Sequence, residues 1–160
     1  MKPKLADDGE SGKAGAPMDL ALAEAERARD LGEVPVGAVV VSAAGEVLAR
    51  AGNRTLAFRD PTAHAELLAI RAACAKLGSE RLTGCDLYVT LEPCAMCAAA
   101  ISYARIRRLY FGAPDPKGGA VEHGPRFFAQ ATCHHAPEIY CGIGEARAAE
   151  LLKRFFDARR

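Results

Sequence analysis

Apolar and polar residues alternate along this chain with the periods of several short helices and strands. Met18 to Leu31 mixes apolar and charged residues as an amphipathic helix does, and the β-branched run from Val36 to Ser42 is typical of a buried strand. A Gly-containing turn and a second strand follow, which predicts a hairpin. The whole pattern predicts, in chain order, helices over residues 18–31, 63–77, 93–104 and 145–158, and strands over residues 36–42, 46–53, 86–91, 107–112 and 138–141.

The order of these elements predicts the architecture. Residues 86–112 form a strand–helix–strand unit, which places two parallel strands in one sheet, whereas the hairpin strands pair antiparallel. We therefore expect an α/β fold, a three-layer α/β/α sandwich around a mixed five-stranded sheet. Residues 112–137 contain several Gly and Pro and are predicted to form a loop.

The first 17 residues differ in composition from the rest of the chain. They are rich in Gly, Pro and alternating charges, so they bury too little apolar surface to offset the entropy of ordering. We predict a disordered N-terminal leader over residues 1–17 and one domain over residues 18–160. The chain has neither a run of about 18 apolar residues nor the apolar core of a signal peptide, which predicts a cytoplasmic protein without a membrane partner.

Charge and cysteine content narrow the possible functions. The formal net charge of +1 excludes a uniformly basic surface, so any nucleic-acid contact must come from local clusters of Lys and Arg. Six cysteines without a secretion signal favour a reducing compartment, where closely spaced thiols more often bind metal than form disulfides. Cys94 and Cys97 have that spacing.

His64, Cys94 and Cys97 can supply the three protein ligands of a catalytic zinc ion, whose fourth position is left for water. Pro93 suits the first position of a helix, which would place Cys94 in the first turn and Cys97 one turn later on the same face. Two thiolates balance the charge of the ion, and His64 is then expected to be a neutral third ligand.

Glu66 is the expected catalytic residue. Residues two apart do not share a helix face, so His64 and Glu66 converge only if both lie at an exposed helix start. Glu66 would then take a proton from the water molecule bound to zinc and return it to the substrate. His-x-Glu followed by Pro-Cys-x-x-Cys is the signature of zinc nucleobase deaminases, which act by hydrolysis.

These motifs lie within a longer stretch that resembles the bacterial tRNA-specific adenosine deaminase family, in residues 33–39, 53–54, 60–66, 87–97 and 111–117. The similarity covers about residues 18–160, and it departs from the usual Gly-Ser-containing pattern at residues 118–124. The resemblance implies the cytidine-deaminase fold, one Zn²⁺ per subunit, a homodimer, and conversion of adenosine to inosine at the wobble position of a tRNA anticodon, chiefly that of tRNA-Arg.

The same resemblance implies substrate-binding roles for several residues. Asn53 is expected to hydrogen-bond the flipped base, and the Ala65 backbone is expected to help hold the ring. Near the C-terminus, aromatic and basic side chains are expected to approach the tRNA anticodon stem-loop, namely Phe155, Phe156, Arg159 and Arg160. Unstacked RNA bases do bind on aromatic rings beside basic groups, and a second basic group contains Arg105, Arg107, Arg108 and Lys117.

The C-terminal residues also have a simpler interpretation. Phe155 continues the apolar spacing of Ala148 and Leu151, so we expect it in the core, which leaves Phe156 freer. Arg159 and Arg160 could be an ordinary solvated helix end that complements the helix dipole. Four other residues match no common metal site and are predicted to be incidental side chains of a surface loop, namely Cys133, His134, His135 and Cys141.

Two other functions compete with RNA deamination. A deaminase of a free base or nucleotide, such as guanine or cytosine, would use the same zinc ligands and Glu66. A noncatalytic, zinc-stabilised RNA-binding module would keep the metal only for folding. Glu66 argues against the second alternative, since a structural zinc site needs no carboxylate beside it.

Overall fold

The structure is a computed structural model that describes residues 4–5 and 8–160, with side chains from Ala16 onward. Its strands form one sheet in the order β1-β6-β5-β4-β2-β3. The strands are β1 (Lys4–Leu5), β2 (Gly37–Val41), β3 (Val47–Gly52), β4 (Asp86–Leu91), β5 (Arg108–Ala113) and β6 (Glu138–Cys141). The helices are α1 (Asp8–Asp30), α2 (Ala65–Leu77), α3 (Ala95–Tyr103) and α4 (Glu145–Asp157), with a 3₁₀ turn at Phe127–Ala129.

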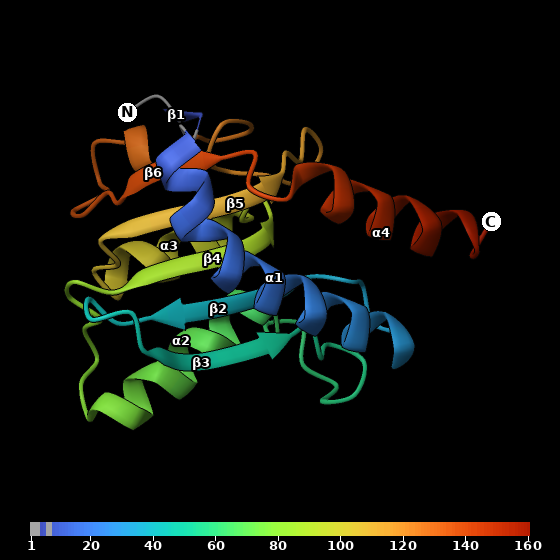
Figure 1. The fold of residues 1–160 in the computed structure, drawn as a ribbon, viewed down its shortest axis with the longest axis horizontal. Helices are drawn as coiled ribbons and strands as arrows, with labels where there is room; N and C mark the ends of the chain where they lie inside the picture. Colours follow the sequence, from blue (N-terminus) through green and yellow to red (C-terminus); the bar gives the residue numbers. More distant parts are fainter. Residues whose placement is uncertain (1–3, 6–7) are drawn as a thin grey trace.

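The sheet is mixed, as expected. β2 pairs antiparallel with both β3 and β4, whereas β4, β5 and β6 are parallel to one another. Helices cover both faces, with α1 and α4 on one side and α2 and α3 on the other (Figure 1). The five expected strands and the three-layer sandwich are therefore confirmed, and the two-residue β1 adds an edge strand beside β6.

Alternation along β2 divides the core between the two faces of the sheet. Val39 and Val41 pack with α1, whereas Ala38 and Val40 pack with α2. Gly37 lets α1 approach closely, because a Cβ atom there would overlap the backbone carbonyl of Ala21. The strand is thus buried on both faces, which explains its unbroken apolar sequence.

Three tyrosines stack across the parallel strands. Tyr88, Tyr110 and Tyr140 are register partners on β4, β5 and β6. Their ring centroids are 4.4 and 4.9 Å apart, and the planes differ by 5° and 15°. Stacked rings of this kind contribute about 0.5–1.5 kcal/mol per pair beyond the burial of their area.

The N-terminal helix begins earlier than its sequence pattern predicts. The predicted start at Met18 is wrong, because α1 begins at Asp8. Extending a helix adds one hydrogen bond per residue, whereas only nucleation is costly, so a helix held by its packed half can extend into a polar segment. Part of the expected disordered leader, residues 1–3 and 6–7, lies outside the described residues, and the division into leader and domain stays a prediction.

Candidate active site

Three strands end at the edge of the sheet where the predicted site residues lie. β3, β4 and β5 run in one direction and end at Gly52, Leu91 and Ala113. Helices α2 and α3 begin at this edge. Ligands of open α/β sheets bind at the carboxyl ends of the strands, so the topology favours a site here.

The three predicted metal ligands meet where these two helices begin. His64 is the N-cap of α2, Cys94 is the N-cap of α3, and Cys97 lies in the first turn of α3. The prediction that Pro93 opens the helix is wrong, because Pro93 precedes the N-cap. Cys94 has an extended backbone and is the N-cap, so the helix begins at Ala95, two residues later than predicted.

The distances between the ligand atoms fit a tetrahedral zinc ion. The Nδ1 atom of His64 lies 3.6 Å from the Sγ atom of Cys94 and 3.6 Å from that of Cys97. Bonds of about 2.3 Å to sulfur and about 2.1 Å to nitrogen, at a tetrahedral angle, separate S and N by about 3.6 Å. In the part of the chain with described side chains, this cluster offers three ligand atoms and leaves a fourth position open.

The electrostatics of the cluster favour a bound cation. A hydrogen bond from Cys97 lowers the pKa of the Cys94 thiol to about 4, and the same bond raises the pKa of Cys97. The hydrogen bond to Cys94 also raises the pKa of His64. One negative charge is therefore shared between two sulfurs, and a divalent cation would displace the remaining thiol proton.

Glu66 follows His64 by two residues and is buried, with 4% of its surface exposed. Burial raises the pKa of its carboxyl to about 7, so the group can both accept and release a proton near neutral pH. It lies in the first turn of α2, beside the metal ligands, as the sequence predicts.

Asn53 holds the start of α2. Its side-chain oxygen accepts a hydrogen bond from the backbone N–H of Ala65 at 2.8 Å, and the side chain is largely buried. The N–H of Ala65 thus has a partner within the chain. This bond uses only the oxygen of the Asn53 side chain and does not involve the two donors of its NH₂ group. The two residues expected to hold a base are therefore joined to one another.

The loop between β3 and α2 is fastened by a carboxylate that sequence reasoning missed. Glu33 is 1% exposed and accepts backbone N–H bonds from Leu56 at 3.0 Å and Ala57 at 2.9 Å. The loop exposes Leu56 and Phe58 to solvent beside the site. An acidic residue just before a buried strand is the only sequence signal for this role.

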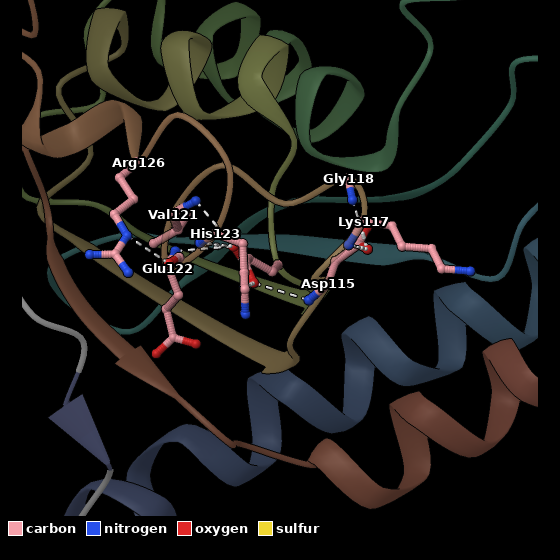
Figure 2. A network of polar contacts seen from close by, with 8 residues as sticks. Asp115, Lys117, Gly118, Val121, Glu122, His123 and Arg126 are labelled. Atoms are coloured by element: carbon pink, nitrogen blue, oxygen red, sulfur yellow. Dashed lines mark hydrogen bonds and ion pairs between the residues drawn. The ribbon is translucent and has the colours of Figure 1, made fainter.

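A second missed carboxylate, Glu92, fastens the loop after β5. It is 2% exposed and accepts bonds from four backbone N–H groups, those of Asp115, Val121, Glu122 and His123. Figure 2 shows Asp115 on one side of this network and Val121, Glu122 and His123 on the other. The signal in the sequence is a carboxylate at the end of a buried strand.

The C-terminal residues of α4 divide as predicted. Phe155 is 5% exposed and Phe156 is 48% exposed, which confirms the core assignment of the first and the freedom of the second. The Arg159 guanidinium lies 3.4 Å from the centre of the Phe155 ring, and Arg160 is exposed. The end of α4 projects beyond the sheet at the edge where β3 ends (Figure 1).

The predicted second basic group is wrong as a unit. Arg107 and Arg108 lie at the opposite edge of the sheet, where they pair with Asp86 and Glu138 at 3.0 and 3.1 Å. Lys117, which follows β5, lies on the side of the site. Sequence proximity brought these residues together, but β5 separates them in space.

The segment with Cys133 and His135 has a structural role. The His135 ring bonds the backbone carbonyl of Ile106 at 2.7 Å, and the Cys133 thiol bonds the carbonyl of His135 at 3.2 Å. Within the described side chains, this segment contributes to neither of the clusters that could hold a metal ion.

Comparison with known proteins shows the family to which the chain belongs. Residues 13–113 match the model of the cytidine and deoxycytidylate deaminase zinc-binding region. The tRNA-specific adenosine deaminase of Agrobacterium fabrum is 64% identical over 143 residues, which cover 89% of this chain and 93% of that protein. The corresponding protein of Rickettsia bellii is 47% identical over 140 residues, covering 87% and 97%.

Solved structures agree with the sequence relatives. A structure from a study of A-to-I editing by tRNA:A34 deaminases at the wobble position has a TM-score of 0.84 and 64% identity, covering 86% of this chain and 99% of that chain. Guanine deaminase from Bacillus subtilis has a TM-score of 0.60 and 39% identity over 62% of this chain and 63% of that one. The chain belongs to the zinc-binding cytidine and deoxycytidylate deaminase family and, within it, to the tRNA-specific adenosine deaminases.

Proposed function

We propose that this chain hydrolyses adenosine to inosine at the wobble position of a tRNA anticodon, in tRNA-Arg. The observation that carries the proposal is the buried Glu66 carboxyl beside an open three-ligand cluster. The tRNA-specific adenosine deaminase that is 64% identical over 89% of the chain supports the choice of substrate. A closed structural zinc site would have a fourth protein ligand in place of the open position.

His64, Cys94 and Cys97 hold the zinc ion in this proposal, and Glu66 is the catalytic residue. When bound, the ion lowers the pKa of a water molecule so that it can act as the nucleophile at neutral pH. Glu66 would accept a proton from that water and pass it to the ring nitrogen beside the reacting carbon. It would then carry a second proton, from the hydroxyl that the attack places on that carbon, to the amino group, which leaves as ammonia. Its pKa of about 7 suits both directions of transfer.

Asn53 and Ala65 hold the flipped base. The hydrogen bond between the Asn53 oxygen and the Ala65 N–H fixes the orientation of the Asn53 side-chain amide. Its NH₂ group is therefore already oriented before a base binds. A base outside its stack is needed because the reacting C6 atom is covered within a helix, and an anticodon loop supplies such a base at low cost.

Phe156, Arg159 and Arg160 contact the anticodon stem-loop. Phe156 offers an exposed ring for stacking, and Arg160 offers an exposed charge. Phe156→Ala is expected to weaken stem-loop binding about tenfold, because a base–aromatic stack contributes about 1–3 kcal/mol. Fluorescence anisotropy with a labelled stem-loop measures this, and Val47→Ala, at an exposed apolar position at the start of β3, is the control.

We also propose that the chain acts as a homodimer in the cytoplasm. Helices α2 and α3 each end in an exposed apolar side chain, Leu77 at 48% and Tyr103 at 76%, which a second copy could cover. Six free cysteines and thiolate ligands suit a reducing compartment. No helix in the described residues is long and apolar enough to cross a membrane. Sedimentation of wild type and Tyr103→Asp tests the dimer.

The deciding experiment offers purified, zinc-loaded protein an arginine anticodon stem-loop with adenosine at the wobble position. Inosine formation is expected, and the same stem-loop with adenosine moved into the paired stem is expected to remain unchanged. Free guanine and cytosine are incubated in parallel. Ammonia release from the free bases alone would replace this proposal by the free-base deaminase, which the similarity to guanine deaminase makes the natural alternative.

A further inference from the structure

Glu92 lies between β4 and the metal ligand Cys94, and its carboxylate is surrounded by hydrogen-bond donors. Oε1 accepts the N–H of Asp115 at 3.0 Å and lies 2.8 Å from Nδ1 of His123. Oε2 accepts the N–H groups of Val121, Glu122 and His123 at 3.1, 3.0 and 3.2 Å. The side chain is fully buried, at 0% exposure. Both oxygens are thus occupied by donors from the chain itself.

These contacts argue against a metal at this second cluster. Glu92, Glu122 and His123 could hold an ion by proximity alone. However, the carboxylate oxygens of Glu92 already accept hydrogen bonds from backbone N–H groups, which stabilise its charge. Burial alone would raise the pKa of Glu92, yet the bonds from Asp115, His123 and the other amides hold it below the ordinary value.

The donors come from a segment without regular structure. Residues 115–123 follow β5 and lie in neither a helix nor a strand, so no ladder of backbone bonds orders them. Two backbone hydrogen bonds also join Glu92 and Pro93 to β5 and the segment after it. The N–H of Ala120 donates to the carbonyl of Pro93 at 2.9 Å, and the N–H of Glu92 donates to the carbonyl of Ala113 at 2.8 Å. Gly119 leaves room, because a Cβ atom there would overlap the Glu92 carboxylate.

The segment is consequently fixed to the residues that precede a metal ligand. Its outward groups, by contrast, are free of the network: Lys117 is exposed and points away from it (Figure 2). Asp115 Oδ1 accepts the N–H groups of Lys117 and Gly118, which orders the turn that carries the lysine. The geometry gives a hydrogen-bonded turn, with an exposed lysine, at the sheet edge where the site lies.

We propose that Glu92 is a positioning residue that holds residues 115–123, with the Lys117 side chain exposed to the RNA, at a fixed place relative to the metal ligands. This inference rests on the proposed function. Glu92 does not touch the reacting atoms, so its contribution is to binding: a segment that is ordered before the RNA arrives has less conformational entropy to lose on binding. Loss of the anchor therefore raises KM and leaves kcat nearly unchanged.

The test uses Glu92→Gln in the full chain, with kcat, KM and Kd measured for the wobble-adenosine stem-loop and zinc content measured by metal analysis. Gln keeps the volume but turns one oxygen into a donor that faces N–H groups. We expect KM and Kd to rise about tenfold, kcat to stay within about twofold, and zinc to stay at one per chain. His123→Ala keeps all four amide bonds and is expected to raise KM about threefold.

Asp86→Asn is the matched control. Asp86 is a buried carboxylate at the other end of β4, paired with Arg107 at 3.0 Å, so its loss perturbs the same strand away from the site. Its KM and kcat are expected to equal those of wild type. If Glu92→Gln does not fold, His123→Ala alone decides the inference through the same split between KM and kcat.

The outcomes separate this inference from the proposed function. A wild-type protein that converts the stem-loop, together with unchanged KM in both variants, overturns the positioning role and leaves the function standing. A parallel fall of kcat and zinc content, with KM constant, also overturns it, since Glu92 would then support the metal site alone. If wild type forms no inosine, the function fails, and the Kd values for the stem-loop still decide the role of Glu92.

Discussion

Glu66 and Glu92 are two buried glutamates, each two residues from a predicted metal ligand, and they differ in almost every other respect. Their exposed fractions are similar, 4% and 2%. Burial raises the pKa of Glu66 to about 7, whereas backbone N–H donors and His123 hold the pKa of Glu92 below its ordinary value despite burial. At similar burial, one carboxyl can therefore accept and release a proton near neutral pH, whereas the other favours its charged form.

The difference teaches that donors determine what a buried carboxylate does. A carboxylate that accepts several amide bonds is stabilised as the charged form and cannot easily take a proton. Glu66 has fewer donors than Glu92: burial raises its pKa, and only its own backbone N–H and the Cys97 side chain act as hydrogen-bond partners that lower it.

The largest effect is expected on turnover. Glu66→Gln removes the proton carrier and should lower kcat by about 10³–10⁴-fold, within the range of general acid–base catalysis, while the protein keeps its zinc and its affinity for the stem-loop. Single-turnover inosine formation and metal analysis measure these quantities. Glu92→Gln keeps kcat in the same assay, so a comparable loss of kcat in both variants would erase the contrast between the two residues.

The next effect concerns the space beside Glu92. Gly119→Ala places a methyl group against the Glu92 carboxylate and 2.5 Å from the backbone oxygen of Asp115, so the loop has to shift. We expect the free energy of unfolding to fall by about 1–3 kcal/mol, as for other overpacked sites. Chemical denaturation checks this. Gly118→Ala at the exposed neighbouring position is the control, and an equal loss there would contradict the crowding explanation.

The pH dependence of stability should have opposite signs at the two residues in the metal-free protein. The pKa of folded Glu66 lies above the value of 4.5 for a free glutamate, so its stabilising protonated form is lost as pH rises toward 7. The unfolding free energy of Glu66→Gln should therefore gain about 1–3 kcal/mol over wild type between pH 4.5 and pH 8. Denaturation curves at several pH values measure the gain.

At Glu92 the sign is reversed. Its folded pKa is lowered, so the stability that it contributes is present above the free value of 4.5 and is lost as pH falls through the folded value. Glu92→Gln should therefore differ most from wild type at neutral pH and least in acid. A difference that is the same at every pH would show that shape and not charge is what Glu92 supplies.

The smallest effect separates the donors of Glu92 from one another. His123→Ala removes one contact at 2.8 Å and leaves four amide bonds, so it should cost only about 0.5–1.5 kcal/mol of unfolding free energy. The acid loss of stability from Glu92 should persist in this variant. Its disappearance would mean that the imidazole, and not the amides, keeps the carboxylate charged.

The sequence predicts the candidate metal ligands because these residues have a characteristic short spacing along the chain. Cys94 and Cys97 need only one turn of helix to converge, and the His-x-Glu pair needs only a helix start. Glu92 cannot be predicted in this way, because its partners lie 23 to 31 residues later, in a loop with no periodic pattern of apolar residues. Contacts of that kind depend on tertiary folding and leave no local pattern.

The same distinction between local signals and long-range contacts applies to the fold. The bounds of β4 and β6 agree with the predicted residues 86–91 and 138–141, since apolar strands flanked by turn residues are marked in sequence. Proximity in sequence groups Arg107 and Arg108 with Lys117, although β5 lies between them and places Lys117 at the other end of the strand. The start of α1 at Asp8 cannot be predicted from the sequence, because a polar segment gives no amphipathic signal.

The stack of Tyr88, Tyr110 and Tyr140 gives the protein an optical property. The chain has four tyrosines and no tryptophan, so tyrosine dominates its near-ultraviolet circular dichroism. Rings whose centroids lie 4.4 and 4.9 Å apart couple electronically, and their signal depends on the register of β4, β5 and β6. The central sheet therefore carries its own spectroscopic label, which reports on strand alignment in every variant without a dye.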